Sequence, residues 1–271
     1  MGRWLVALIP LLAAFGLAGC PSSVEAMRRA DTRYRLANDA YARGNYITAV
    51  EEAERALKIY EKHAEAHHLL GLFYTINKPD CGKAEFHYKK AINFHDGPFS
   101  KAKNSLASLY INVCDRVDDA IPLLEECLAD IKYYKESWAA EFNMGRALTY
   151  KKRDDDAESH FQRALLINPG MCGAYYQLGG IYNRRGELDK AVEYFGKSTT
   201  ATGCEKNVVG FLELGLAYEK WGKKAEAIAP FLTCARLAPV SSEGSTCETK
   251  ASTLCADASV AAAVEECRAL K

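Results

Sequence analysis

The ten cysteines and six histidines of this 271-residue chain are the side chains best suited to metal binding or redox chemistry. The densest group is His63, His67 and His68, in which two imidazoles lie four residues apart. This spacing differs from the H-E-x-x-H arrangement of zinc proteases, and the sequence contains no C-x-x-C pair. The sequence therefore predicts no metal site, and we expect these histidines in a surface turn.

Other patterns typical of enzymes are also missing from the sequence. It contains no glycine-rich phosphate loop and no nucleophile elbow. We interpret the run Asp154, Asp155 and Asp156 as a solvated turn that favours the start of the following helix. With 35 basic and 35 acidic residues, the chain has no electrostatic footprint for nucleic acid. We expect neither catalysis nor a cofactor nor a small-molecule substrate.

An apolar leader precedes Cys20. A single cation, Arg3, is followed by an apolar block from Trp4 to Phe15 and then by small residues. This layout is typical of a secretory signal. About a dozen apolar residues are too few for a stable transmembrane helix, which needs ~20, so an anchor helix is the less favoured alternative. We expect residues 1–19 to be a signal peptide.

The segment Leu17-Ala18-Gly19-Cys20 resembles the lipobox of bacterial lipoproteins. The resemblance implies that the chain is cut before Cys20 and that this thiol is acylated. More than one acyl chain gives near-permanent attachment, because each buried methylene contributes about 0.8 kcal/mol. Pro21, in place of Asp, favours the outer membrane, with the protein facing the periplasm. Residues 20–29 then form a short linker and the start of a helix.

A pattern of about 34 residues recurs from residue 30 to residue 241. The clearest copies run from Tyr175 to Tyr182 and from Phe211 to Tyr218, each an aromatic-x-x-Leu-Gly-x-x-Tyr motif. A glycine, an alanine and a phenylalanine follow each copy at fixed distances, and the glycine suits a left-handed helix cap. The six predicted units are 30–63, 64–98, 100–134, 138–171, 172–205 and 208–241.

The order and spacing of these residues resemble the tetratricopeptide repeat (TPR), a helix-turn-helix unit. The resemblance implies an all-α, right-handed superhelical solenoid of about six repeats. No single repeat can bury its apolar face, so the stack is the folding unit. Residues 242–271 depart from the pattern. We expect a loop over Ser241–Ser245 and a capping helix over Ala256–Leu270.

Behind a secretory leader, the cysteines predict disulfides. Cys81 and Cys114 are one repeat apart, as are Cys172 and Cys204, so each pair falls on the same edge of the solenoid and is predicted to be bridged. Cys127 takes the place of a small alanine, and we expect it to be buried and unpaired. Two more bridges could form among Cys234, Cys247, Cys255 and Cys267, with the pairing open.

In TPR proteins the concave surface is lined by positions 2, 5, 9, 12 and 13 of each first helix. The resemblance places aromatic rings, Asn and Arg there, a mixture that suits the binding of a peptide segment. The alternative for each tyrosine is packing against a neighbouring helix. The predicted partner-binding residues are Tyr34, Asn38, Tyr41, His68, Asn104, Phe142, Arg146, Tyr150, Tyr176, Asn183 and Arg184. Further positions on the same surface are Leu72, Ser108, Ile111, Leu212 and Leu216.

A lipobox followed directly by six such repeats resembles the pilotin lipoproteins of type IV pili, the PilF/PilW/Tgl group. That family implies an outer-membrane lipoprotein that binds secretin subunits and promotes their assembly into a ring. The expected partners are therefore secretin subunits and, through the acyl anchor, the lipid bilayer. The alternative is a periplasmic scaffold that organises peptidoglycan hydrolases or barrel-assembly components.

Overall fold

The computed structural model describes residues 23–130, 135–257, 259–260 and 265–268. These residues form thirteen α-helices and a short 3-10 helix, Glu265–Arg268, and none of them forms a strand. None of the described helices is both long and apolar enough to cross a bilayer. The leader and Cys20 lie outside the described residues, so signal cleavage and acylation stay predictions.

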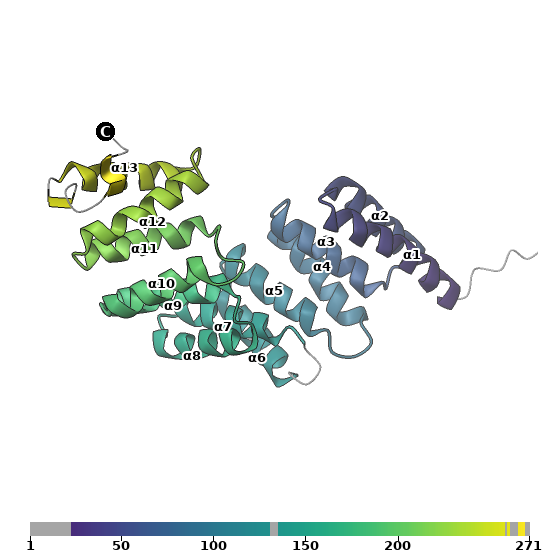
Figure 1. The fold of residues 1–271 in the computed structure, drawn as a ribbon. Helices are drawn as coiled ribbons and strands as arrows, with labels where there is room; N and C mark the ends of the chain where they lie inside the picture. Colours follow the sequence, from purple (N-terminus) through teal and green to yellow (C-terminus); the bar gives the residue numbers. More distant parts are fainter. Residues whose placement is uncertain (1–22, 131–134, 258, 261–264, 269–271) are drawn as a thin grey trace, which may run out of the picture.

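Twelve of the helices form six pairs joined by short turns (Figure 1). The first helices are α1 (Ser23–Ala42), α3 (Ala64–Ile76), α5 (Ser100–Asn112), α7 (Ser137–Tyr150), α9 (Cys172–Arg185) and α11 (Val208–Lys220). The second helices are α2 (Tyr46–Ile59), α4 (Cys81–Phe94), α6 (Val117–Ala129), α8 (Asp154–Ile167), α10 (Leu188–Thr200) and α12 (Lys224–Leu237). Each first helix packs mainly on the second helix of its own pair, so the pair is the structural unit.

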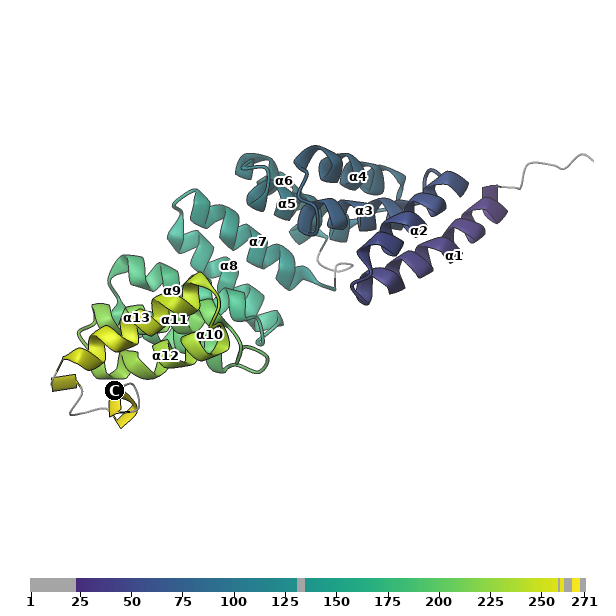
Figure 2. The ribbon, with the colours of Figure 1, turned by 90° about the horizontal axis from the view of Figure 1, so that it is seen from above.

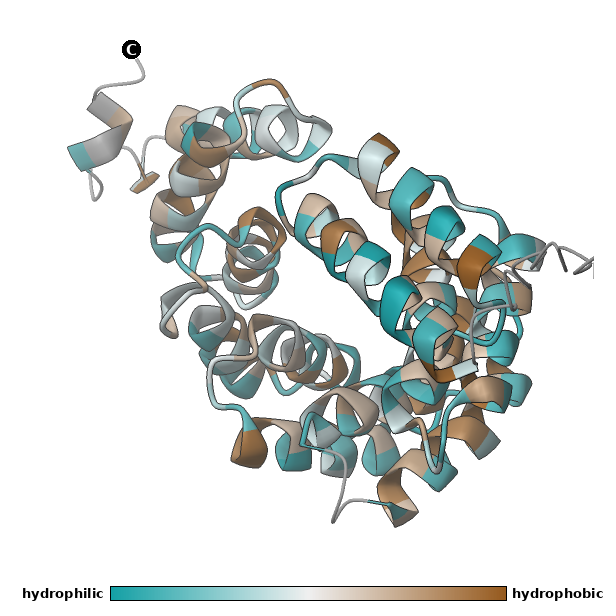
Figure 3. Cartoon of the chain, turned by 90° about the vertical axis from the view of Figure 1, so that its right-hand side faces the viewer, coloured by the Kyte–Doolittle hydropathy of each residue, from teal (hydrophilic) through white to brown (hydrophobic). Residues whose placement is uncertain are grey.

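Successive pairs stack into a curved superhelix (Figures 1 and 2). The neighbouring first helices α1–α3, α3–α5 and α5–α7 contact each other more closely than any two neighbouring second helices. The first helices therefore line the concave side and the second helices the outer side. Hydrophobic and hydrophilic residues alternate along the helices, as expected when each helix is buried on one face only (Figure 3). The predicted all-α TPR superhelix is confirmed.

A glycine facing an aromatic ring brings the two helices of four repeats close together. The pairs are Gly71 with Tyr88, Gly145 with Phe161, Gly179 with Phe195 and Gly215 with Phe231. A β-carbon on Gly179 would lie 2.6 Å from Cδ1 of Phe195, which is closer than two carbon atoms can approach. All four rings are buried, so they have little room to move away. The repeat motif therefore contains glycine because a larger residue would overlap the facing ring.

A second set of glycines ends helices. Gly186 follows α9 with a φ of 80°, and its N–H bonds to the Tyr182 and Asn183 carbonyls. Gly44 and Gly222 have φ values of 77° and 81°. Only glycine adopts this left-handed region without strain. The predicted left-handed caps are thus present.

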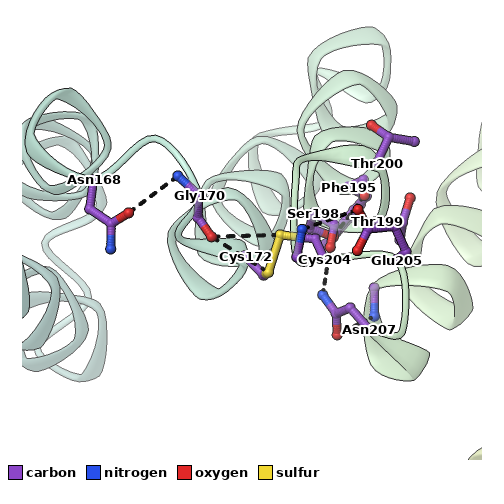
Figure 4. The surroundings of a disulfide bond; sticks show 12 residues. Asn168, Gly170, Cys172, Phe195, Ser198, Thr199, Thr200, Cys204, Glu205 and Asn207 are labelled. Atoms are coloured by element: carbon purple, nitrogen blue, oxygen red, sulfur yellow. Dashed lines mark hydrogen bonds between the residues drawn. A yellow bond between two sulfur atoms is a disulfide. The ribbon is translucent and has the colours of Figure 1, made fainter.

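Four disulfides join cysteines that are distant in sequence. Cys81–Cys114 and Cys172–Cys204, the pairs suggested by the repeat spacing, have Cα–Cα distances of 5.6 and 5.5 Å. Figure 4 shows the second of these beside Gly170 and Asn207. The pairing left open by the sequence is Cys234–Cys247 and Cys255–Cys267. Cys127 is buried and unpaired, and its thiol donates to the Ser100 carbonyl at 3.2 Å.

The end of the solenoid differs from the prediction. Ser242–Ala256 form helix α13, so the loop predicted over Ser241–Ser245 is wrong. Helix α13 ends at Ala256, where the predicted capping helix was expected to begin, and the described part of the predicted range includes the 3-10 helix Glu265–Arg268. Ser241 caps α13, because its Oγ accepts a hydrogen bond from the Gly244 N–H at 3.0 Å. The serines and threonines of this segment resemble a loop in composition. In the structure three threonines bond to backbone carbonyls four residues earlier, which keeps them compatible with a helix.

Candidate functional site: the concave surface

Side chains on the concave surface bond from one repeat to the next. The bonded pairs are Tyr41–Asn77 (3.0 Å), His68–Ser105 (3.1 Å), Asn104–Asn143 (3.0 Å) and Asn183–Lys220 (2.8 Å). Each pair links two successive first helices, so part of the predicted surface is engaged in holding the superhelix together. The polar groups left over are the ones available to a partner.

The eleven predicted partner-binding residues differ in exposure. Asn38, Tyr150 and Arg184 are exposed, and His68 is buried. The half-buried ones are Tyr34, Tyr41, Asn104, Phe142, Arg146, Tyr176 and Asn183. Several rings pack within their own repeat: the centroids of Phe142 and Phe161 are 5.7 Å apart. The aromatic residues thus take part in both roles considered from the sequence, packing against neighbouring helices and lining the surface.

His68 lies beneath the concave surface. It is only 6% exposed, its Nε2 lies 3.1 Å from Ser105 Oγ, and its ring packs between Tyr88 and Phe99. The small Ser105 leaves room for the imidazole between the repeats. Burial lowers the pKa of His68 to about 4, so the ring is neutral at pH 7. His68 is therefore not accessible to a partner on this surface.

The surface turn predicted for His63, His67 and His68 is wrong, because all three side chains are buried. His63 caps α3, since its Nδ1 accepts a hydrogen bond from the Ala66 N–H at 3.2 Å. His67 Nδ1 lies 3.0 Å from His87 Nδ1, so one ring donates to the other. Burial lowers the pKa of both rings, that of His87 to about 4. The described residues contain no group of three or more His, Cys, Asp or Glu placed to hold a metal ion.

Stability should therefore decrease as the pH falls through the window between about 6.5 and 4. The pKa of His68 is near 6.5 in the unfolded chain and about 4 in the folded chain, so the unfolded state binds more protons within this window. The contribution of neutral His68 is complete above the window and is lost on acidification, amounting to about 3 kcal/mol over the whole window. His68→Gln cannot titrate, and its amide can still bond Ser105. Urea unfolding of both proteins at pH 7 and pH 4.5 should show a shallower loss for the variant, and equal losses would contradict the assignment.

Arg184 is engaged by the preceding repeat. Its Nε and Nη2 donate to both carboxylate oxygens of Asp154, at 3.0 and 2.7 Å. Arg185 forms similar bonds to Asp155 and Glu158. The acidic run begins α8, as expected, but it also pairs with α9 and is more than a solvated turn. These partly exposed pairs contribute about 1 kcal/mol each.

A small pocket lies between α7 and α9. Its volume is about 190 Å³, and it is lined by Arg146, Thr149, Tyr150 and Gln177. Gln177, together with Glu213 on α11, was missed by the sequence analysis because it occupies position 6 of its first helix. Position 6 contacts position 5 of the preceding repeat, as His68–Ser105 and Asn104–Asn143 show. The polarity of position 6 is the sequence signal that identifies both residues.

Comparison with known families and structures supports the repeat assignment. Tetratricopeptide-repeat profiles match residues 29–69, 173–202 and 210–241. No curated protein matches the sequence. The structure of PilW, described as a widely conserved type IV pilus biogenesis factor, is 20% identical with a TM-score of 0.72, over 81% of this chain and 98% of PilW.

Two further solved structures have related folds. PilF of Pseudomonas aeruginosa is 22% identical with a TM-score of 0.68, over 84% of this chain and 99% of PilF. A MamA structure is 26% identical with a TM-score of 0.51, over 65% of this chain and 92% of MamA. Three segments of the chain therefore match tetratricopeptide-repeat profiles, and its fold is similar to those of PilW and PilF.

Proposed function

We propose that this protein is a lipid-anchored, pilotin-like factor that promotes assembly of the outer-membrane secretin of type IV pili. The observation that carries the proposal is the extent of the fold similarity, which covers 98% of PilW and 99% of PilF. A TPR superhelix offers a concave surface for a protein partner, and the resemblance to pilotins suggests that this partner is a secretin subunit. The lipobox before Cys20 supports the same location.

The short connection between Cys20 and the first repeat supports a partner at the membrane. Helix α1 begins at Ser23, three residues after Cys20. An extended chain spans about 3.5 Å per residue, so an acylated Cys20 would hold the start of α1 within roughly 10 Å of the lipid headgroups. A protein bound in the concave surface would then also lie close to the bilayer.

Deletion of the gene tests the proposal. Secretin multimers, which can be resolved by gel electrophoresis without boiling, should disappear while secretin monomer accumulates. Restoring the wild-type gene should restore the multimers. Unchanged multimers would contradict the proposal. If cell-wall morphology changed at the same time, the scaffold for peptidoglycan hydrolases would be the better function.

Substituting Cys20 tests the anchor separately. Cys20→Ser removes the thiol that would be acylated, so the protein should move from the membrane fraction to the soluble periplasmic fraction. Cys127→Ala is the matched control, because Cys127 forms no disulfide and lies inside the repeats. The control should stay with the membranes. An undiminished membrane fraction for Cys20→Ser would contradict acylation, and immunoblots of fractionated cells provide the measurement.

A further inference from the structure

Glu213 on α11 is a half-buried carboxylate without a counter-charge. Burial raises its pKa, which reflects the lack of groups that stabilise its charged form. Within the described ranges, no hydrogen bond and no ion pair to Glu213 is present. A partly buried polar group left unpaired destabilises a protein by about 1 to 3 kcal/mol. Glu213 differs in this respect from the polar residues of the concave surface that are paired between repeats.

The equivalent residues of the third and fourth repeats are satisfied, whereas Gln177 of the fifth repeat forms no hydrogen bond within the described residues. Ser105 bonds to His68 and Asn143 bonds to Asn104, in each case from position 6 of one repeat to position 5 of the preceding repeat. Tyr176 is the residue equivalent to His68 and Asn104 beside Glu213. Burial raises the pKa of Tyr176, and the negative charge of Glu213 raises it further. The two side chains form no hydrogen bond, so the polar contact that joins position 5 to position 6 in the second to fourth repeats is absent here.

Lysines and arginines of the neighbouring elements are already engaged elsewhere. Lys220 donates to the backbone and side-chain oxygens of Asn183, and Arg184 binds Asp154. Lys250 of α13 donates to Glu219 at 2.8 Å. In another part of the molecule, a pocket of about 650 Å³ lies between α4, α5 and α6. The charged side chains that line this pocket also pair with one another, as Lys103 does with Glu126 at 2.5 Å. None of the three neighbouring cations is therefore bonded to Glu213, which forms no ion pair within the described residues.

The surroundings of Glu213 suit a long aliphatic side chain that ends in a cation. Leu212 and Leu216 on α11 and Tyr176 on α9 are half-buried, so each keeps part of its apolar surface accessible. Position 9 of α9 is Gly180, which presents no side chain and lets a bound backbone approach. A lysine or arginine could lay its methylenes on these residues and place its charge at the carboxylate.

We propose that the concave surface around Glu213 binds a lysine or arginine side chain from an extended internal segment of the partner protein. The inference rests on the proposed function only in that the partner is a protein held on this surface. Partial burial strengthens the ion pair beyond that of an exposed pair, and binding restores a partner to the carboxylate. Glu213 thus selects for basic residues in the bound segment.

Three synthetic dodecapeptides test the proposal. They share one extended Ala/Ser/Val sequence and differ only at a central residue, which is Lys, Gln or Glu. Fluorescence polarisation with the full mature chain should show that the Lys peptide binds at least about tenfold more tightly than the Gln peptide, a difference of about 1.4 kcal/mol. Glu213→Gln should abolish this preference, and Glu213→Lys should shift it toward the Glu peptide.

Glu193→Gln is the matched control. Glu193 is exposed on the second helix α10 and pairs with Lys197 at 2.5 Å, so this variant should keep the preference for the Lys peptide. Circular dichroism should show that every variant stays folded. The proposal is overturned if wild-type protein binds the Lys and Gln peptides equally or binds neither at millimolar concentration. It is also overturned if Glu213→Gln retains the preference. None of these results depends on secretin multimers, so the two proposals can fail separately.

Discussion

Replacing Cys81, Cys114, Cys172 and Cys204 together by serine should lower the free energy of unfolding of the oxidised protein by about 7 kcal/mol. The two bridges close loops of 33 and 32 residues, and each restricts the unfolded chain by roughly 3 to 4 kcal/mol. The effect should be large because each repeat is held only by its immediate neighbours. Guanidinium denaturation followed by circular dichroism provides the measurement.

The reduced proteins provide the control for this variant. Under a reducing agent, wild type and variant differ only by four thiols in place of four hydroxyls, so their unfolding curves should nearly coincide. Hydrogen exchange should show that the oxidised variant loses protection mainly in α4, α5, α9 and α10, the helices nearest the missing bridges. A loss below about 2 kcal/mol in the oxidised state would mean that the bridges do not constrain the unfolded chain as argued.

Phe195→Ala should destabilise the fifth repeat by about 3 to 5 kcal/mol, because the ring is 1% exposed and its removal leaves a cavity against α9. Gly179→Ala in the wild-type background should also destabilise, by about 1 to 3 kcal/mol, since its new methyl overlaps that ring. In the Phe195→Ala background the same methyl fills vacated space. The effect of Gly179→Ala should therefore be neutral or stabilising there, which a double-mutant cycle measures.

Gly196→Ala separates the steric argument from the general preference of helices for alanine. Gly196 lies in α10, and no atom lies within 4 Å of the β-carbon that alanine would add. This substitution should stabilise the protein by about 0.5 to 1 kcal/mol. If Gly179→Ala behaved in the same way as Gly196→Ala, close packing against Phe195 would not explain the repeat motif.

Much of the fold could be predicted because the repeat motif has a direct steric cause. Gly179 and Phe195 recur at the spacing that places one helix against the next, so the period locates the helices. The same period placed Cys172 near Cys204. The helix Ser242–Ala256 could not be found in this way, because it lies after the last repeat. Its serines and threonines become compatible with a helix only through backbone bonds that composition does not reveal.

The candidate site could be predicted less well, since family positions identify a helix face but not the neighbours of each side chain. His68 occupies a surface position of the repeat, yet Ser105 of the next repeat is small enough to let it be buried. Arg184 is bound by Asp154, which lies 30 residues earlier in the chain. Glu213 was overlooked because position 6 is not among the family positions. Only the contacts between repeats distinguish engaged from available groups.

The burial of Cys127 has a consequence for how the protein oxidises. Its pKa is raised to about 12, mainly by burial, so only about one molecule in 10⁵ carries the thiolate at pH 7. Thiol–disulfide exchange requires a thiolate that can reach a sulfur atom. Once the third repeat has folded, Cys127 is therefore unreactive in thiol–disulfide exchange. It cannot exchange with the four disulfides or form a disulfide between two molecules. The folded protein therefore keeps its disulfide pairing under oxidising conditions although Cys127 is a free thiol.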